Sequence, residues 1–186
     1  DIEYLLTSSL SFSTVVPAVM GTGELFASFQ FVRRARLGPR LRADAPTTHL
    51  LAIVGLIMFL LLMFWPHIFF PFTWTFLVFM LEPINVWLGN RSALTWTNRR
   101  DWRPIIALWL GVLACGFFWE MWNYFSYPKW VYSIPYFEFL HIFEMPLLGY
   151  LGYLPFASEL LAVVHCLYVW LGRPPSTYLI AGLAPD

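Results

Sequence analysis

The chain has 186 residues and no net formal charge, because 11 Lys and Arg residues balance 11 Asp and Glu residues. Hydrophobic side chains make up 59% of the sequence and charged side chains only 12%, whereas an average soluble domain carries about 25% charged residues. This composition excludes an ordinary soluble enzyme, a disordered chain and a nucleic-acid-binding protein, which would need a basic excess.

The first apolar segment, residues 4–32, is the least regular one. It is rich in Ser and Thr, and it also contains Pro17, two glycines and Glu24. Such residues are tolerated in a membrane helix when they face other helices. We therefore predict a first membrane span over residues 4–32.

The next segment, residues 50–81, contains no Asp, Glu, Lys or Arg. A single helix of this length would measure about 48 Å, whereas the hydrocarbon core of a bilayer is about 30 Å thick. Because Pro66 lies near the middle of the segment, we predict two spans, 48–65 and 67–88, joined by a tight turn at Pro66-His67.

Residues 105–125 and 147–171 are the last two apolar stretches, and each is long enough to cross a membrane. Each stretch is interrupted by two polar residues, first Glu120 and Asn123, then Glu159 and His165. The predicted fold class is all-α, a polytopic transmembrane helical bundle of about five spans. We treat residues 1–186 as one integral membrane domain. Its last part, residues 173–186, is a cytoplasmic tail, which we expect to be extended over the surface.

The basic residues predict how these spans are oriented. Most of them lie in the two loops that follow the first and third spans: Arg33, Arg34, Arg36, Arg40, Arg42, Arg91, Arg99, Arg100 and Arg103. Basic loops face the cytoplasm in membrane proteins. We therefore predict a multi-pass protein of the bacterial inner (cytoplasmic) membrane, with its N-terminus outside and its C-terminus in the cytoplasm.

The segment before the last span is punctuated by prolines. Between two of them, residues 136–145 are expected to form a short amphipathic helix at the membrane interface. Its polar side carries Glu138, His141 and Glu144 at intervals of three residues. These three side chains are weak candidates for a metal site, and they equally fit a solvated interfacial face.

Polar side chains inside the predicted spans are candidates for function, because ionisable groups in a membrane are costly and usually face the bundle interior. Gly116, Glu120 and Asn123 are spaced by four and three residues, so they share one helix face. For this face and for Glu159, three interpretations stay open: a helix–helix contact, a catalytic or proton-handling carboxylate, and a ligand contact. If the protein is an enzyme, Glu120 or Glu159 acts as general acid. Asn123 and His141 would then orient the substrate.

His165 is a candidate for cofactor binding. A neutral imidazole inside a membrane can ligate a metal centre, and the magnesium of a chlorophyll-type pigment is one possibility. A hydrogen-bonded residue in a helix–helix contact is the alternative. The cofactors that we consider are bound lipid, a carotenoid and a chlorophyll-type pigment.

Two stretches resemble a group of uncharacterised bacterial polytopic membrane proteins. They read Gly-Phe-Phe-Trp-Glu-Met-Trp-Asn at 116–123 and His-Ile-Phe-Glu-Met-Pro-Leu-Leu-Gly-Tyr-Leu-Gly-Tyr-Leu-Pro-Phe at 141–156. The resemblance covers about the last third of the chain and implies a bacterial inner membrane. The chain is more weakly similar to carotenoid-pathway membrane cyclases and hydratases, but their acidic motifs do not match residue for residue.

The predicted function is that of a non-enzymatic accessory or structural subunit of a larger bacterial membrane complex, with photosynthetic and respiratory complexes as candidate hosts. The short loops leave mainly helix sides for contact, and the many aromatic side chains suit partner helices, lipids or flat pigments. No nucleic-acid partner is expected. The alternative is an intramembrane enzyme that acts on a lipid, isoprenoid or carotenoid by carboxylate acid–base chemistry.

Overall fold

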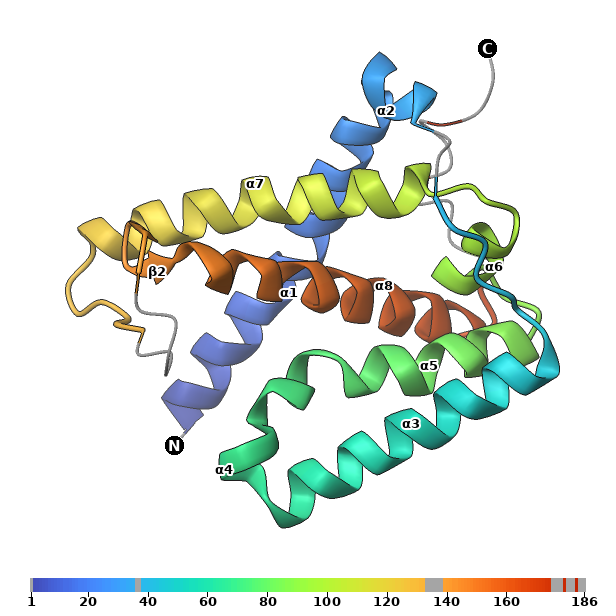
Figure 1. The fold of residues 1–186 in the computed structure, drawn as a ribbon. Helices are drawn as coiled ribbons and strands as arrows, with labels where there is room; N and C mark the ends of the chain where they lie inside the picture. Colours follow the sequence, from blue (N-terminus) through green and yellow to red (C-terminus); the bar gives the residue numbers. More distant parts are fainter. Residues whose placement is uncertain (1, 36–37, 133–138, 175–178, 180–182, 184–186) are drawn as a thin grey trace.

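The computed structural model describes residues 2–35, 38–132, 139–174, 179 and 183. These residues are mostly helical, and the strands among them form only one hairpin with two residues in each strand. The predicted all-α class is therefore confirmed. Figure 1 shows α3, α5, α8 and α7 running side by side in that order, with α1 crossing α7 and α8 at a steep angle.

Helix α1 (Ile2–Ser28) packs against α7 (Arg103–Phe125) through two glycines. A Cβ atom added at Gly111 would lie 2.5 Å from the backbone nitrogen of Gly23, so the two helix backbones are in contact there. The Oγ1 atom of Thr22 and the Sγ atom of Cys115 lie 3.1 Å apart at the same crossing. After this crossing the short helix α2 (Gln30–Arg34) continues the chain.

Helix α3 (Ala45–Phe64) begins where the Asp44 side chain accepts a hydrogen bond from the Thr47 N–H, at 3.1 Å. It ends just before Pro66, which starts the short helix α4 (Pro66–Phe69). The chain then returns through the 3₁₀ helix η1 (Phe70–Trp74) and α5 (Phe76–Trp87). The predicted break at Pro66 is therefore confirmed, but the tight turn expected at Pro66-His67 is wrong, because both residues lie in α4 and the returning arm is a helix pair bent by 44°.

After α5, the short helix α6 (Ala93–Asn98) leads into α7. Its first turn is closed by a capping box between Ser92 and Thr95. The last long helix consists of the 3₁₀ helix η2 (Leu147–Gly152) followed by α8 (Tyr153–Trp170). The core of the bundle lies between α1, α7 and α8, where it includes Leu108, Val112, Ala157 and Leu161.

Four helical segments in the described residues are long and apolar enough to cross a membrane, judged by length and composition alone. They are Leu5–Ser28, Ala45–Phe64, Arg103–Phe125 and Leu147–Trp170. The bent pair Pro66–Trp74 and Phe76–Trp87 becomes a fifth if it is counted as one broken span. The helices lie close to the predicted span limits.

The predicted interfacial helix over 136–145 is wrong in its described part, residues 139–145. Strand β1 (His141–Ile142) pairs antiparallel with β2 (Met145–Pro146), and the Leu147 N–H donates to the Leu140 carbonyl at 2.8 Å. A helix is disfavoured immediately before Pro146, because the proline ring crowds the preceding residue out of helical geometry. Phe143 also adopts a φ of 59°, which turns the chain back.

The expectation of an extended surface tail is wrong for two of its residues. Leu179 and Leu183 are buried in the hydrophobic core, and a Cβ atom at Gly23 would lie 2.9 Å from the Leu179 side chain. Burying a leucine side chain is favourable by about 1.5–3 kcal/mol. This gain explains why these leucines leave the surface. Most of the predicted tail after residue 174 lies outside the described residues.

Candidate functional site

Glu120 lies at the centre of a polar cluster that joins α7, α8 and the loop between them. Its side chain is only 2% exposed. The hydroxyl of Tyr153, at the start of α8, donates to Oε1 at 2.7 Å, and the hydroxyl of Tyr132, in the loop, donates to the same oxygen at 2.8 Å. Glu120 therefore fixes both the second helix and the loop to α7.

Gly116 makes room for this arrangement one turn earlier on α7. A Cβ atom there would lie 2.6 Å from a ring carbon of Tyr153, so a larger residue would push the ring away. The spacing of Gly116 and Glu120 thus places an open surface and a hydrogen-bond acceptor on one helix face. This geometry agrees with the interpretation of the face as a helix–helix contact.

The second carboxyl oxygen of Glu120 is in a different situation. Oε2 is buried and has no hydrogen-bond partner among the residues that the structure describes. Leaving a buried polar atom unpaired is unfavourable by about 1–3 kcal/mol. Chemically, Oε2 is the atom of this cluster that could donate a proton as an acid or accept a hydrogen bond from a ligand.

Tyr132 is a permanent hydrogen-bond donor in this cluster. Burial raises the pKa of its hydroxyl well above the ordinary value, and the hydrogen bond to Glu120 raises that pKa further. The phenol therefore keeps its proton at physiological pH. The loop thus places a protonated phenol against the Glu120 carboxyl group.

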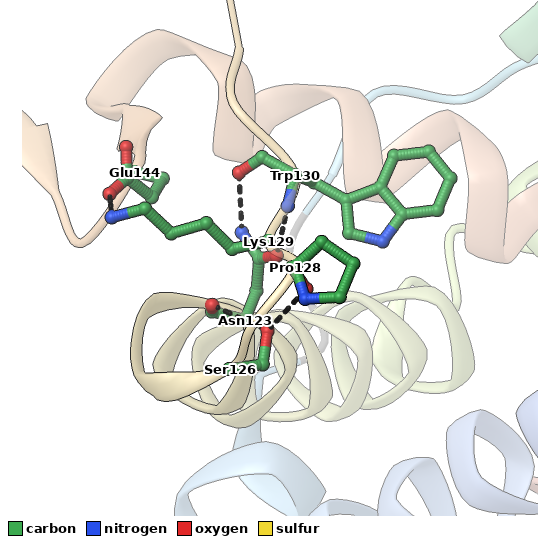
Figure 2. Close-up of polar contacts among 6 residues, drawn as sticks. All are labelled: Asn123, Ser126, Pro128, Lys129, Trp130 and Glu144. Atoms are coloured by element: carbon green, nitrogen blue, oxygen red, sulfur yellow. Dashed lines mark hydrogen bonds and ion pairs between the residues drawn. The ribbon is translucent and has the colours of Figure 1, made fainter.

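Asn123 holds the same loop in place, as Figure 2 shows. Its Oδ1 accepts from the Trp130 N–H at 2.6 Å, and its Nδ2 donates to the Trp130 carbonyl at 2.9 Å. Ser126 closes the turn by donating to the Pro128 carbonyl at 3.2 Å. The amide of Asn123 is thus engaged on both sides by the backbone, which is a positioning role for the loop.

In the part of the chain that the structure describes, the weak candidates for metal ligands are not brought together. His141 is exposed in β1, and Glu144 forms an ion pair with Lys129 (Figure 2). Glu138 lies outside the described residues, so the triad as a whole stays a prediction. Within the described part of the chain, no group of three His, Cys, Asp or Glu side chains is placed to hold a metal ion.

Glu159 is buried, but it does not join Glu120. It lies six residues after Tyr153 on α8, which corresponds to about 9 Å along the axis and a rotation of about 240°. Its carboxyl group faces the Leu77 backbone on α5, and its Oε1 has no hydrogen-bond partner among the described residues. The two candidate acids are therefore separate: Glu120, on α7, meets α8 at Tyr153, whereas Glu159 lies on another face of α8 and is turned toward α5.

A second polar cluster lies near the other end of α8, where it meets α5 and α6. Glu82 on α5 accepts a hydrogen bond from the Leu94 N–H at 2.8 Å, so it caps the start of α6. Asn85 donates to the Ala162 carbonyl at 3.0 Å, and Asn90 donates to the His165 carbonyl at 2.6 Å. These side chains bind α6 and the loop before it to α8.

His165 is part of this packing and is 0% exposed. Its ring meets the Trp96 ring edge to face, with the centroids 5.7 Å apart. The Arg91 backbone faces the imidazole, but neither ring nitrogen has a partner within hydrogen-bond geometry among the described residues. Because the imidazole is fully buried, a flat pigment could reach it only if the side chains packed around it moved. Ligation by His165 stays a prediction.

Sequence reasoning missed several members of both clusters. They are Tyr132, Tyr150 and Tyr153 around Glu120, and Asn85 and Asn90 around Glu82. Asn85 had a usable signal, because it follows Glu82 by three residues within an apolar run and so shares its helix face. The tyrosines had none, because only the packing of α7 on α8 brings them to Glu120.

Comparisons with protein-family models, curated proteins and solved structures found no match for this chain. The case for a function therefore rests on the geometry of the residues themselves. Most of the predicted site residues described above connect helices and loops of the bundle. Within the described part of the chain, buried side-chain atoms without a hydrogen-bond partner remain on Glu82, Glu120, Glu159 and His165.

Proposed function

We propose that the protein is a non-enzymatic accessory subunit of a larger bacterial membrane complex, which it contacts through the sides of its helices. The observation that carries this proposal is the exposure of the first half of α1. From Ile2 to Thr14 every side chain that the structure describes is exposed, whereas the same helix is buried at Val19, Met20 and Ala27. Among the residues that the structure describes, the first half of this candidate span therefore has no buried side chain.

The chemistry of that exposed half suits another helix better than lipid. Hydroxyls of Ser11, Ser13 and Thr14 donate to carbonyls of their own helix at 2.6–2.8 Å. Each hydroxyl oxygen can still accept a hydrogen bond, which lipid tails do not donate. Small hydroxyl-bearing residues also let a second helix approach closely. A transmembrane partner would use both properties.

The candidate catalytic residues support the same proposal. Asn123 is engaged by the Trp130 backbone, His141 is exposed in the hairpin, and the two glutamates face different neighbours. An active site would need such groups to converge on one substrate position. Of these residues, Glu120 and Asn123 connect α7 with α8 and with the loop.

The bacterial inner membrane location and the orientation are part of the proposal. The loops between α2 and α3 and between α5 and α7 lie together, because Trp102 Nε1 donates to the Pro39 carbonyl at 2.9 Å and Arg40 Nε donates to Asn98 Oδ1 at 3.2 Å. We call this part of the molecule the basic end. The positive-inside rule assigns it to the cytoplasm. The opposite end, with Lys129 and Glu144, then faces outward.

Purification from native membranes in a mild detergent tests the subunit role. The particle is sized on a native gel, its components are identified by mass spectrometry, and its absorption is scanned across the visible and near-infrared. A large particle with fixed partners is expected, and colour would identify a photosynthetic or cytochrome-bearing respiratory host and a bound pigment. A small, colourless particle that carries only lipid would overturn the proposal.

A photo-crosslinking residue makes the same test specific to α1. Placed at Ser11, it should yield one defined protein adduct. Placed at Ile53, which is exposed on α3 and is the matched control, it should yield mainly lipid adducts. Equal protein adducts at both positions, or lipid alone at Ser11, would contradict a partner on α1.

A second candidate function is favoured by one observation: Oε2 of Glu120 is buried and has no hydrogen-bond partner among the described residues. In this alternative, Glu120 protonates a double bond of a lipid or isoprenoid as general acid. The Glu120→Gln variant separates the two functions, because the amide keeps an acceptor for both tyrosines. An enzyme would lose turnover while it stays folded and assembled, whereas a subunit would have no turnover to lose.

A further inference from the structure

A groove opens on the surface where α3 begins and α5 ends. It has a volume of about 350 Å³ and is lined by Ala43, Ala45, Thr48, His49, Val86 and Trp87. Trp87 Nε1 donates to Thr48 Oγ1 at 3.0 Å, and the His49 ring lies 5.4 Å from the Trp87 ring. The groove is therefore mainly apolar, and its aromatic wall is fixed by a hydrogen bond.

The helices that line the groove determine the level in the bilayer at which it lies. Ala45 is the first residue of α3 and Trp87 is the last residue of α5, so the groove lies at the ends of two candidate spans. Tryptophan side chains concentrate at this level of a bilayer, where acyl chains meet headgroups. The apolar walls continue toward the middle of the membrane along α3.

The mouth of the groove lies next to cations. Arg42 directly precedes the lining residue Ala43, Arg40 lies three residues before it, and both arginines are exposed. The hydrogen bond from Arg40 to Asn98 fixes the loop and uses only one of the five N–H groups of that guanidinium. The remaining donors suit the oxygens of a phosphate group. The nearby Asp44 carboxylate is occupied by capping α3 through Thr47.

We propose that this groove and the two arginines bind one anionic phospholipid, with the phosphate at Arg40 and Arg42 and an acyl chain along the groove. The occupant is a lipid because the site combines cations with an apolar channel at membrane depth. A soluble anion would use only the arginines, and a neutral lipid would use only the channel. The site is independent of the subunit role, since neither Ser11 nor Glu120 contributes to it.

Lipid titration of the delipidated, full-length protein in detergent tests the phosphate contact. Bound phosphatidylglycerol and phosphatidylcholine with identical acyl chains are counted by native mass spectrometry. We expect phosphatidylglycerol to bind about tenfold more tightly, in line with the attraction of two cations near a membrane surface. The double variant Arg40→Gln with Arg42→Gln should lose this preference.

The matched control removes two other exposed arginines, Arg34 and Arg173, by substitution with Gln. Neither belongs to an element that lines the groove. Their removal should change the preference by less than about twofold, because distant exposed charges are screened. Equal losses in the two double variants would show a diffuse charge effect and overturn the site.

The variant Ala45→Leu tests the channel, because the added side chain at this exposed position occupies the groove without entering the core. It should weaken phosphatidylglycerol binding several-fold. Glycerol phosphate is the competitor that carries the headgroup chemistry without acyl chains, and it should displace the lipid poorly. Displacement at equal concentrations, or unchanged binding by Ala45→Leu, would overturn the lipid as occupant.

Discussion

The hydroxyl of Tyr153 donates to Oε1 of Glu120 at 2.7 Å, and this bond links the first residue of α8 to the middle of the last two turns of α7. Because the acceptor is a buried carboxyl group, loss of this hydrogen bond leaves a buried oxygen with one hydrogen bond fewer. A carboxyl group within a membrane span can thus serve packing as directly as it can serve catalysis.

Tyr153→Phe should therefore lower the free energy of unfolding by about 1–3 kcal/mol, the range for a hydrogen bond to a buried or charged group. Unfolding in mixed detergent micelles, followed by circular dichroism, measures the change. Tyr127→Phe is the control, because Tyr127 is 100% exposed, and it should leave stability unchanged. An equal effect of both substitutions would argue against the Glu120 contact.

Asn123→Ala should release the loop that carries Trp130 and Tyr132. Two hydrogen bonds to the Trp130 backbone disappear, with a loss of roughly 1–3 kcal/mol in stability. Amide hydrogen exchange in the loop should become faster. Lys129→Gln breaks a partly exposed ion pair with Glu144 and a cation–π contact with the Tyr124 ring, and each of these should contribute no more than about 1 kcal/mol to stability.

Gly111→Ala and Gly21→Ala should have opposite effects. A Cβ atom at Gly111 would collide with the Gly23 backbone, so α1 would have to move off α7, at a cost of typically 1–3 kcal/mol. No atom lies within 4 Å of a Cβ atom at Gly21. There, alanine should stabilise the helix by roughly 0.5–1 kcal/mol. Destabilisation by Gly21→Ala would indicate a contact on α1 that the monomer does not explain.

Asn90→Ala should weaken the second polar cluster. Its Nδ2 bridges the His165 carbonyl and the Asn85 side chain, and both acceptors would be left buried. We expect a loss of about 1–3 kcal/mol. Asn98→Ala removes the hydrogen bond to the exposed Arg40 and is the matched control. A smaller loss for Asn90 than for Asn98 would contradict the bridge.

The start of α3 should become less stable in acid. Hydrogen bonds from Thr47, first from its side chain and then from its backbone, hold the pKa of Asp44 below its ordinary value of 3.8, and Arg42 lowers it further. A pKa that is lower in the folded state adds stability above the unfolded-state value, and that stability disappears as the pH falls through the folded-state value. The protection of the Thr47 and Thr48 amides, measured as their exchange relative to the intrinsic rate at each pH, should therefore fall below pH 3.8. Asp44→Ala should show fast exchange at all pH values.

The helical organisation was predictable because it depends on local chemistry. Apolar runs of span length form helices wherever backbone groups must be paired within the segment, and Pro66 ends α3 because its ring excludes a continuing helix. The hairpin at His141–Pro146 was not predictable from the spacing of Glu138, His141 and Glu144. Period-three polar residues also occur in turns, and the φ of 59° at Phe143 leaves no pattern in the sequence.

The sequence by itself determined the all-α class, the limits of the apolar helices and which carboxyl groups lie within them, since these depend on composition and on residues close together in the chain. Only the tertiary structure decided what those carboxyl groups do. Glu120 meets Tyr132 and Tyr153, whereas Glu159 faces α5, because helices that pack at an angle bring together residues far apart in the sequence. That pairing depends on the close approach of the α1 and α7 backbones at Gly111 and on the space that Gly116 leaves for the Tyr153 ring. No local sequence pattern specifies either of them.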